Sequence, residues 1–166
     1  RPLVGIAAGG EFSCVIREGG GPWCIGEGSA GQLGHGEMED SPTLVRPLGL
    51  DRVQQLALGR DHGCARLLGG NVYCWGENEE GQLGDGNYES SAVPVRVINL
   101  EPVTQIVAGR LHNCALEVDG AIKCWGYGLG GRLGNQQHRS RRAPIQVAGI
   151  APAEAVAVGG GHGCAL

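Results

Sequence analysis

The chain has 166 residues, of which 42% are hydrophobic and 18% are charged, a balance that excludes a disordered chain and fits a single soluble globular domain. Thirty-two glycines beside one Phe, three Trp and three Tyr indicate many tight turns and short strands rather than long helices. The formal net charge of -4 gives no sign of a nucleic-acid partner, and no apolar run approaches the ~20 residues of a membrane span.

A period of 50 residues runs through the whole chain without insertion or deletion. It divides the chain into three full repeats, 1–50, 51–100 and 101–150, and a partial fourth repeat, 151–166. Two series with this step contain every cysteine of the chain: Cys14, Cys64, Cys114 and Cys164, and then Cys24, Cys74 and Cys124.

Each repeat is expected to hold four short strands in the same order. Apolar positions predict a first strand over 53–58, and 103–108 repeats it one period later. In the third repeat the second strand is expected over 112–117 and the third over 121–125, joined by a three-residue hairpin loop that ends in Gly. A fourth strand is expected near Pro94–Val97 and Pro144–Val147, with proline at its start. Four antiparallel strands in about 50 residues are typical of a propeller blade.

The same residues resemble the regulator of chromosome condensation repeat family. In the second repeat the resemblance is carried by Ala57-Leu58-Gly59, His62-Gly63-Cys64-Ala65, Tyr73-Cys74-Trp75-Gly76 and Gly81-Gln82-Leu83-Gly84. It covers nearly the whole chain, and it implies an all-β fold of four-stranded blades, about three and a third of them here, within a ring of seven. A fold of this kind does not by itself define a function.

The first repeat departs from the pattern at two aromatic positions. It has Phe12 where the other repeats have histidine, and Ile25 where they have tryptophan. Trp23 lies two positions earlier, so we expect this blade to have repacked around the relocated ring.

The cysteines of each hairpin are expected to face each other across neighbouring strands. Opposed Cβ atoms roughly 4.5 to 5.5 Å apart can be bridged with modest adjustment. Three disulfides would place the protein in an oxidising compartment, either extracellular, periplasmic or at the cell surface. Buried free thiols are the first alternative. A zinc site from His62, Cys64 and Cys74, or from the matching residues of the third repeat, is the second. The predicted pairs are Cys14 with Cys24, Cys64 with Cys74, and Cys114 with Cys124.

No catalytic set or cofactor motif is expected. Histidine recurs at 62, 112 and 162, and a structural imidazole bonded to neighbouring backbone accounts best for a residue that recurs at the period of the blades. No Ser, His and carboxylate group recurs, and the triple-glycine segments lack the following lysine of a phosphate loop. We therefore predict a protein that is not an enzyme and needs no metal or cofactor.

The segments that do not repeat are the candidates for partner binding. Between the Gly-rich loop and the fourth strand, the first repeat is acidic and the third is strongly basic. Loops at equivalent positions lie on the same side of a propeller, so they could form a binding rim with a charge gradient, although solvated variable loops are the simpler interpretation. The candidate residues are Glu37, Glu39, Asp40, Tyr88, Glu89, Tyr127, His138, Arg139, Arg141 and Arg142.

The sequence thus favours a non-catalytic protein-binding or scaffolding module of a secreted or surface protein, of a bacterial type. Exchange of guanine nucleotide on a small GTPase is the first alternative; exchange factors that resemble this chain carry a wedge-like insertion, for which the 50-residue step leaves no room. Inhibition of a secreted enzyme is the second, with Tyr88 and Tyr127 as rim aromatics. Because a closed propeller needs roughly 200 to 350 residues at this period, the chain is expected to be part of a longer protein that supplies the remaining blades.

Overall fold

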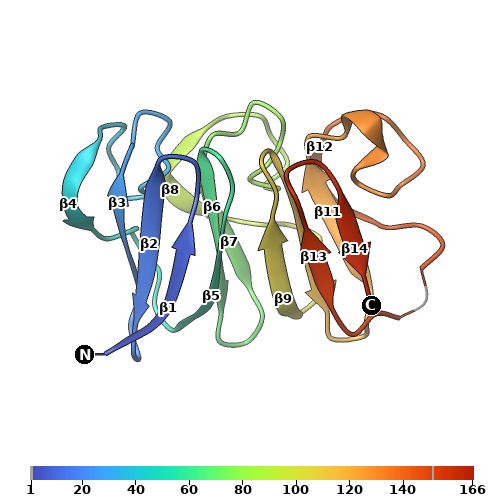
Figure 1. Cartoon of the computed structure of the whole chain (residues 1–166), viewed down its shortest axis with the longest axis horizontal. Coiled ribbons are helices and arrows are strands. Elements are labelled where there is room, and N and C mark those ends of the chain that lie inside the picture. Colours follow the sequence, from blue (N-terminus) through green and yellow to red (C-terminus); the bar gives the residue numbers. More distant parts are fainter. Residues whose placement is uncertain (1, 151) are drawn as a thin grey trace.

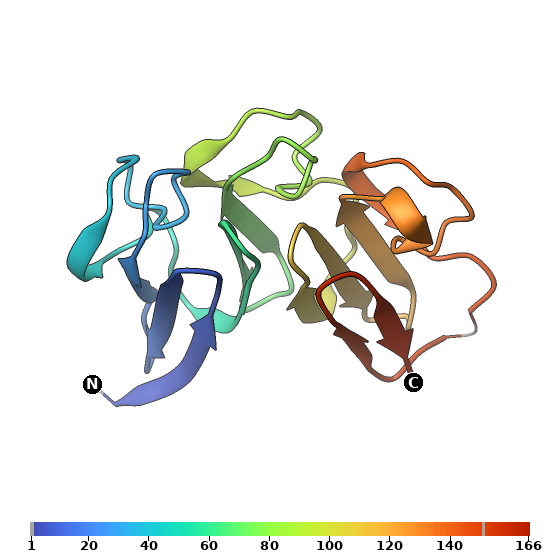
Figure 2. The ribbon, with the colours of Figure 1, turned by 45° about the horizontal axis from the view of Figure 1, so that its top comes forward.

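The structure is a computed structural model that describes residues 2–150 and 152–166. It is all-β: three four-stranded antiparallel sheets and one two-stranded sheet follow one another along an arc (Figures 1 and 2). Each sheet is one blade of a propeller, which confirms the predicted fold class. Within the described residues, no helix is both long and apolar enough to cross a membrane.

Strands follow the chain order within every blade. The first blade holds β1 (Leu3–Ala8), β2 (Phe12–Arg17), β3 (Pro22–Gly26) and β4 (Ser41–Val45). The second holds β5 (Val53–Leu58), β6 (His62–Leu67), β7 (Val72–Gly76) and β8 (Ser91–Arg96), and the third holds β9 (Val103–Ala108), β10 (His112–Glu117), β11 (Ile122–Gly126) and β12 (Arg141–Gln146). β13 (Val156–Val158) and β14 (Gly163–Ala165) form the partial fourth blade.

The register of the central hairpins is the predicted one. Cys14 pairs with Cys24, Cys64 with Cys74 and Cys114 with Cys124 as direct cross-strand partners. The turn of the third hairpin closes with the amide of Glu117 donating to Ala121, and Gly120 there has a φ of 85°. A left-handed residue at this position costs glycine nothing, which explains the recurrent glycine of the turn.

The outer strands begin earlier than the sequence indicated. β8 starts at Ser91 and β12 at Arg141, so Pro94 is not the first residue of its strand. The ladder is irregular here, because Cys74 pairs with Val95 but Gly76 pairs with Ser91. An edge strand with a bulge tolerates proline, since no partner requires its missing N–H.

The first strands of the blades line the inner side of the arc, where β1, β5, β9 and β13 contact one another in turn. Backbone hydrogen bonds join the turns that follow them: Gly10 donates to Arg60, Arg60 to Arg110 and Arg110 to Gly160. The turns line an open hollow of 540 Å³. Each blade is therefore fixed to the next beside this hollow.

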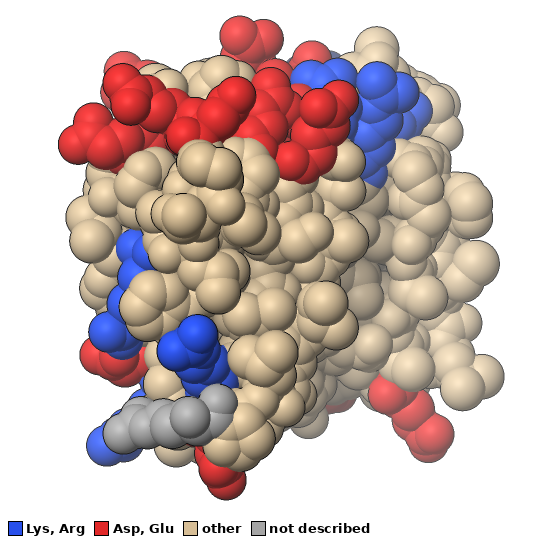
Figure 3. All heavy atoms as spheres, turned by 60° about the vertical axis from the view of Figure 1, so that its left-hand side comes forward, with Lys and Arg blue, Asp and Glu red and all other residues tan. Residues whose placement is uncertain are grey.

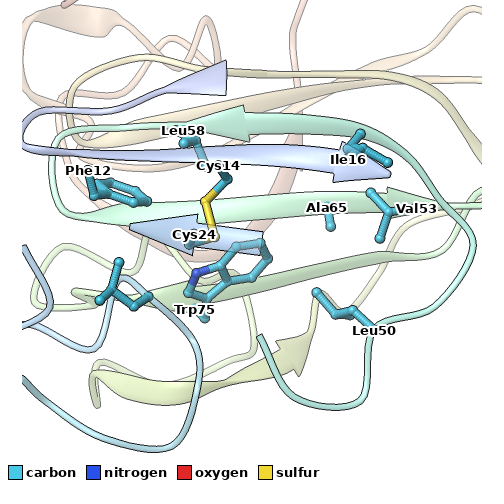
Figure 4. Packing of buried hydrophobic residues seen from close by; sticks show 10 residues of the cluster. Phe12, Cys14, Ile16, Cys24, Leu50, Val53, Leu58, Ala65 and Trp75 are labelled. Carbon is cyan, nitrogen blue, oxygen red and sulfur yellow. A yellow bond between two sulfur atoms is a disulfide. The ribbon is translucent and has the colours of Figure 1, made fainter. Parts of the chain in front are cut away.

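A tryptophan from one blade fills a groove on the previous blade. Trp75 is fully buried, and its indole N–H donates to the carbonyl of Gln32 at 2.7 Å. A Cβ at Gly34 would lie 2.9 Å from the Trp75 ring, so only glycine leaves room for it. Figure 4 shows the ring beside the Cys14–Cys24 disulfide, within the buried cluster shared by the first two blades. Trp125 repeats the arrangement one blade later, donating to Gln82 at 2.9 Å.

The first blade did not repack around Trp23, and that prediction is wrong. Phe12 is buried in the core cluster, whereas Trp23 is only partly buried and lies under the guanidinium of Arg17, 5.0 Å from the ring centroid. Trp23 has the same strand parity as Ile25, but it lies two residues farther from the loop end of β3 and is therefore offset from the strand position that Trp75 has in β7.

The second and third blades are also joined by polar side chains. The amide of Gln55 bonds to both backbone groups of Ile106, accepting from its N–H at 3.0 Å and donating to its carbonyl at 2.9 Å. Nε2 of His62 lies 2.9 Å from Oδ1 of Asn113, whose own amide donates to Gln82 at 2.7 Å. In the first blade the position of Gln55 is Gly5, so this interface lacks the same amide clamp.

Candidate functional site

The segments that differ between repeats lie together at one end of the blades. This loop face consists of the turns 9–11, 59–61 and 109–111 and the loops 27–40, 77–90 and 127–140 (Figure 1). Each loop is joined to the start of the outer strand of the next blade, because Gly36 donates to the carbonyl of Ala92 in β8 and Gly86 to that of Arg142 in β12, each at 2.9 Å. The three loops therefore form one continuous surface.

The second loop closes around a buried side chain. Asn78 is fully buried, and its Oδ1 accepts from the amide of Leu83 at 2.9 Å. Its Nδ2 lies 3.0 to 3.3 Å from oxygens of Asp85, Asn87 and Glu89. This amide holds the segment that carries Tyr88 in one conformation, so the rim of the second blade is preorganised.

The first and third loops have glycine at the matching positions and close directly on backbone. A Cβ at Gly28 would lie 1.9 Å from the carbonyl of Glu39, and one at Gly128 would lie 1.9 Å from that of Arg139. The residue twelve positions later closes each loop: Asp40 accepts from the amide of Gly28 at 3.0 Å. Asp40, predicted as a partner-binding residue, therefore also has a structural role.

Most of the predicted binding residues lie on the loop face. Glu37, Glu39, Glu89, His138 and Arg139 are exposed. Tyr88 is 47% exposed, with the guanidinium of Arg142 5.7 Å from its ring centroid.

Three predicted residues are placed differently from the expectation. Arg141 and Arg142 were expected in a loop, but they are the first two residues of β12, because the outer strand starts early. Tyr127 is partly buried beneath Arg132, whose guanidinium lies 4.5 Å from the ring centroid. Tyr127 therefore presents less of its ring to a partner than Tyr88 does.

The structure adds charged residues that the sequence reading missed. Arg60 pairs with Asp61 and with Glu77, the latter at 3.4 Å. Partial burial raises the pKa of the Glu77 carboxyl, and the neighbouring Glu79 and Glu80 add to this rise, while Arg60 opposes it. These residues belong to the repeated loop segments and the short turns. They were not predicted as binding residues because the prediction used only the segments that differ between repeats.

The cysteine pairs are disulfides, as predicted. Sulfurs bridge Cys14 to Cys24, Cys64 to Cys74 and Cys114 to Cys124, with Cα atoms 4.1 Å apart in each pair. Sulfurs joined in this way are not thiolate ligands, and the zinc alternative therefore loses its donors. Cys164 is free and exposed.

Two of the three recurrent histidines, His62 and His112, are buried structural residues, whereas His162 is exposed. The backbone partner expected for the buried rings is wrong. The imidazole of His62 pairs with the side chain of Asn113 instead, and neither ring nitrogen of His112 has a partner in the described part of the chain. Burial lowers the pKa of both imidazoles to about 4. Both rings are therefore neutral at physiological pH.

Solved structures with this fold include several longer propellers. Prp20p of Saccharomyces cerevisiae, described with its binding properties to Gsp1p and histones, is 19% identical with a TM-score of 0.85 over 97% of this chain and 42% of that one. Human WBSCR16 is 20% identical with a TM-score of 0.71, covering 99% of this chain and 57% of that one. The ectodomain of the Physcomitrella patens receptor kinase CR4 is 24% identical with a TM-score of 0.61, covering 96% of this chain and 33% of that one. The chain thus spans less than two thirds of each of these structures.

A search of curated protein sequences found no match. The model of the regulator of chromosome condensation repeat matches residues 20–66, 69–116 and 119–166, and a second model of the same repeat matches 53–82 and 103–131. Each of the three longer matches runs from the third strand of one blade to the second strand of the next, and so includes the contacts that join two blades. The chain belongs to the regulator of chromosome condensation (RCC1) repeat family.

Proposed function

We propose that this chain is a non-catalytic protein-binding part of a larger propeller that works in an oxidising compartment, in a secreted or cell-surface protein. One observation carries the binding role: the segments that differ between repeats are gathered on one face and held there by buried contacts. Repeated elements hold the blades together, whereas varied side chains on a fixed scaffold are suited to recognising a partner.

The compartment follows from the disulfides. Three bridges, each across a central hairpin, would be reduced in a cytosol rich in thiols. Mass spectrometry of protein isolated from its native source, with and without reduction, should show a difference of about 6 Da, two hydrogens for each bridge. An unchanged mass would remove this support.

We propose that the remaining blades of the propeller are supplied by the same protein or by a partner of the same fold. The groove beside the partial fourth blade, lined by Leu133, Gly134 and Val156, has a volume of 260 Å³. Its Leu-Gly pair matches Leu33 and Gly34, which receive Trp75 in the first interface. A tryptophan of a completed fourth blade would fit there, and a ring of seven blades would complete the arc.

Crosslinking tests the binding face. A photoreactive amino acid at Tyr88, on the loop face, is compared with one at Leu68, which is 61% exposed in a hairpin turn at the opposite end. We expect a partner protein, identified by mass spectrometry, to crosslink to position 88. The same protein should not crosslink to position 68. Crosslinking from both positions to the same extent, or from neither, would contradict the proposal.

Exchange of guanine nucleotide on a small GTPase is a second candidate, favoured by the structural similarity to Prp20p, whose described partners include Gsp1p. Release of labelled GDP from a panel of small GTPases tests it, and we expect no acceleration. Inhibition of a secreted enzyme is a weaker candidate, because only Tyr88 of the two predicted rim aromatics is well exposed.

A further inference from the structure

We propose that the loop face binds a protein whose contact surface is divided by charge: basic where it meets the first two blades and acidic where it meets the third. This inference rests on the proposed function and specifies the chemistry of the partner. It depends on the positions of the carboxylates relative to those of the arginines on the loop face.

Carboxylates and arginines occupy separate parts of the loop face. In its segments from the first two blades, Arg60 is the only Lys or Arg; in those from the third blade, together with the start of β12, there is no Asp or Glu. Figure 3 shows the acidic side chains as a band along the loop end, with basic side chains at one end of the band. The acidic half is Glu11, Glu27, Glu37, Glu39, Asp40, Asp61, Glu77, Glu79, Glu80, Asp85 and Glu89, and the basic half is Arg110, Arg132, Arg139, Arg141 and Arg142.

Most of the acidic half is not neutralised within the chain. At the loop end, both ion pairs of the described residues use Arg60, which contacts Asp61 and Glu77. Glu37, Glu39 and Glu79 are exposed and form no ion pair in the described part of the chain. Repulsion among such carboxylates is relieved when a partner brings cations to them, and this favours association with a basic surface.

The boundary between the halves is held in place by contacts between the second and third blades. Oγ of Ser140 donates to the carboxylate of Glu80 at 2.5 Å, and Gly86 donates to the carbonyl of Arg142 at 2.9 Å. Tyr88 extends from the second blade to the guanidinium of Arg142. The two halves therefore keep a fixed order and spacing, which lowers the entropic cost of binding a partner with matching charges.

A partner of one sign fits this face less well. A uniformly basic surface would place its cations against the arginines of the third blade, and nucleic acid would place phosphates against the carboxylates of the first two. Like charges brought together in an interface oppose binding and select against the wrong partner. A surface with both signs in the matching order avoids both penalties.

Peptides of one composition but different charge order test the proposal. The first probe has a lysine block followed by a glutamate block, and the second has the same residues in alternation. We expect the block peptide to bind this chain on the order of tenfold tighter in fluorescence anisotropy at low salt, with the difference shrinking as salt rises. Equal affinities would overturn the proposal, and so would a lysine-only peptide that binds as tightly as the block peptide.

A charge exchange that preserves the net charge provides the sharpest variant. The double variant Glu39→Lys with Arg139→Glu puts one wrong charge in each half, and we expect the preference for the block peptide to disappear. The control is Glu18→Lys, which replaces glutamate by lysine in an exposed turn at the opposite end of the blade. It should leave the preference for the block peptide intact. Urea unfolding of each variant shows whether it is folded.

This test is separate from the crosslinking experiment. If position 88 crosslinks a partner but both peptides bind equally, the binding face stands and only the charge order is wrong. If position 88 gives no partner, the proposed function itself fails.

Discussion

One position in the second strand makes a different contact with the next blade in each repeat. His62 forms a hydrogen bond with the side-chain amide of Asn113 on the next blade. Phe12, its counterpart in the first blade, makes apolar contacts instead. His112 has the ring but not the amide, because Gly163 stands where the repeat would place the counterpart of Asn113. Within the residues that the structure describes, the buried imidazole of His112 has no hydrogen-bond partner, which costs stability.

Gly163→Asn should supply the missing partner. A Cβ at position 163 would lie 3.4 Å from the nearest atom, Cγ1 of Val158, which is an ordinary van der Waals contact. We expect the free energy of unfolding in urea to rise by about 1 kcal/mol over that of Gly163→Ala, the control for the loss of glycine. Gly63→Asn should destabilise instead, because its Cβ would lie 2.8 Å from the Trp75 ring. Equal stability of the Asn and Ala variants at 163 would contradict the explanation.

Because His62 and His112 are buried, we expect the free energy of unfolding to decrease in mild acid. Their pKa of about 4 in the folded chain lies below the usual histidine value of 6.5, so the unfolded chain binds more protons between these limits. Stability is therefore unaffected above pH 6.5 and falls as the pH drops toward 4, by about 3 kcal/mol for each histidine.

His112→Phe tests this, since Phe12 shows that the position accepts the ring. Urea unfolding from pH 7 to 4 should show a shallower loss for the variant than for the parent chain. The carboxylates contribute equally to both proteins, so the difference between the curves reports the histidine. Parallel curves would show that His112 does not titrate as its burial indicates.

At the scale of the element, each central hairpin is a closed unit clipped by a disulfide, and separate contacts join it to its neighbours. The second and third blades share the amide clamp between Gln55 and Ile106, while the first blade has Gly5 at the matching position. The interface between the first two blades therefore depends on apolar packing, the indole hydrogen bond of Trp75 and backbone hydrogen bonds such as that from Gly10 to Arg60.

Gln55→Ala should weaken the joint between the second and third blades. The variant leaves both backbone groups of Ile106 without this partner, and we expect a loss of about 2 kcal/mol in the free energy of unfolding, with faster amide exchange at Ile106. Gln54→Ala is the matched control, because Gln54 is exposed and makes, among the described residues, a single hydrogen bond, which is 3.5 Å long and runs to the carbonyl of Arg52. Similar losses in both variants would show that the clamp contributes little.

At the scale of the whole molecule, the arc leaves apolar faces uncovered that the inner blades bury. Ile6 is 81% exposed, whereas Ile106, its counterpart in the third blade, is 1% exposed beneath the second blade. Leu3 is also exposed, while its counterparts Val53 and Val103 are buried. An uncovered sheet face of this kind promotes association.

Ile6→Ser should reduce self-association of the chain and leave its unfolding nearly unchanged. Ile106→Ser, the same change at the buried counterpart, should cost about 3 kcal/mol or more, because it removes a core side chain and buries a hydroxyl. Sedimentation velocity measures the first effect and urea unfolding the second. A large loss of stability for Ile6→Ser would mean that this face is covered.

Much of the fold could be predicted from local chemistry. The pairing of Cys114 with Cys124 follows from counting outward from a three-residue turn, and the structure has that register. The start of β12 could not be found in this way, because Arg141 and Arg142 read as loop and the bulge that admits Pro144 depends on pairing with β11. Trp23 was misplaced for a related reason: its environment depends on Arg17 of the neighbouring strand.

The sequence alone determined the period, the four-stranded blade and the three disulfide pairs, because each rests on contacts between residues close in the chain. Only the tertiary structure decided the contacts between residues about 50 positions apart. It placed Trp75 in the groove of Gly34 and set Asn113 against His62, and it gave His112 no hydrogen-bond partner among the described residues. It also gathered carboxylates from turns and loops of two blades into one half of a face and arginines of the third into the other, since the charge of a surface depends on which chain segments lie side by side.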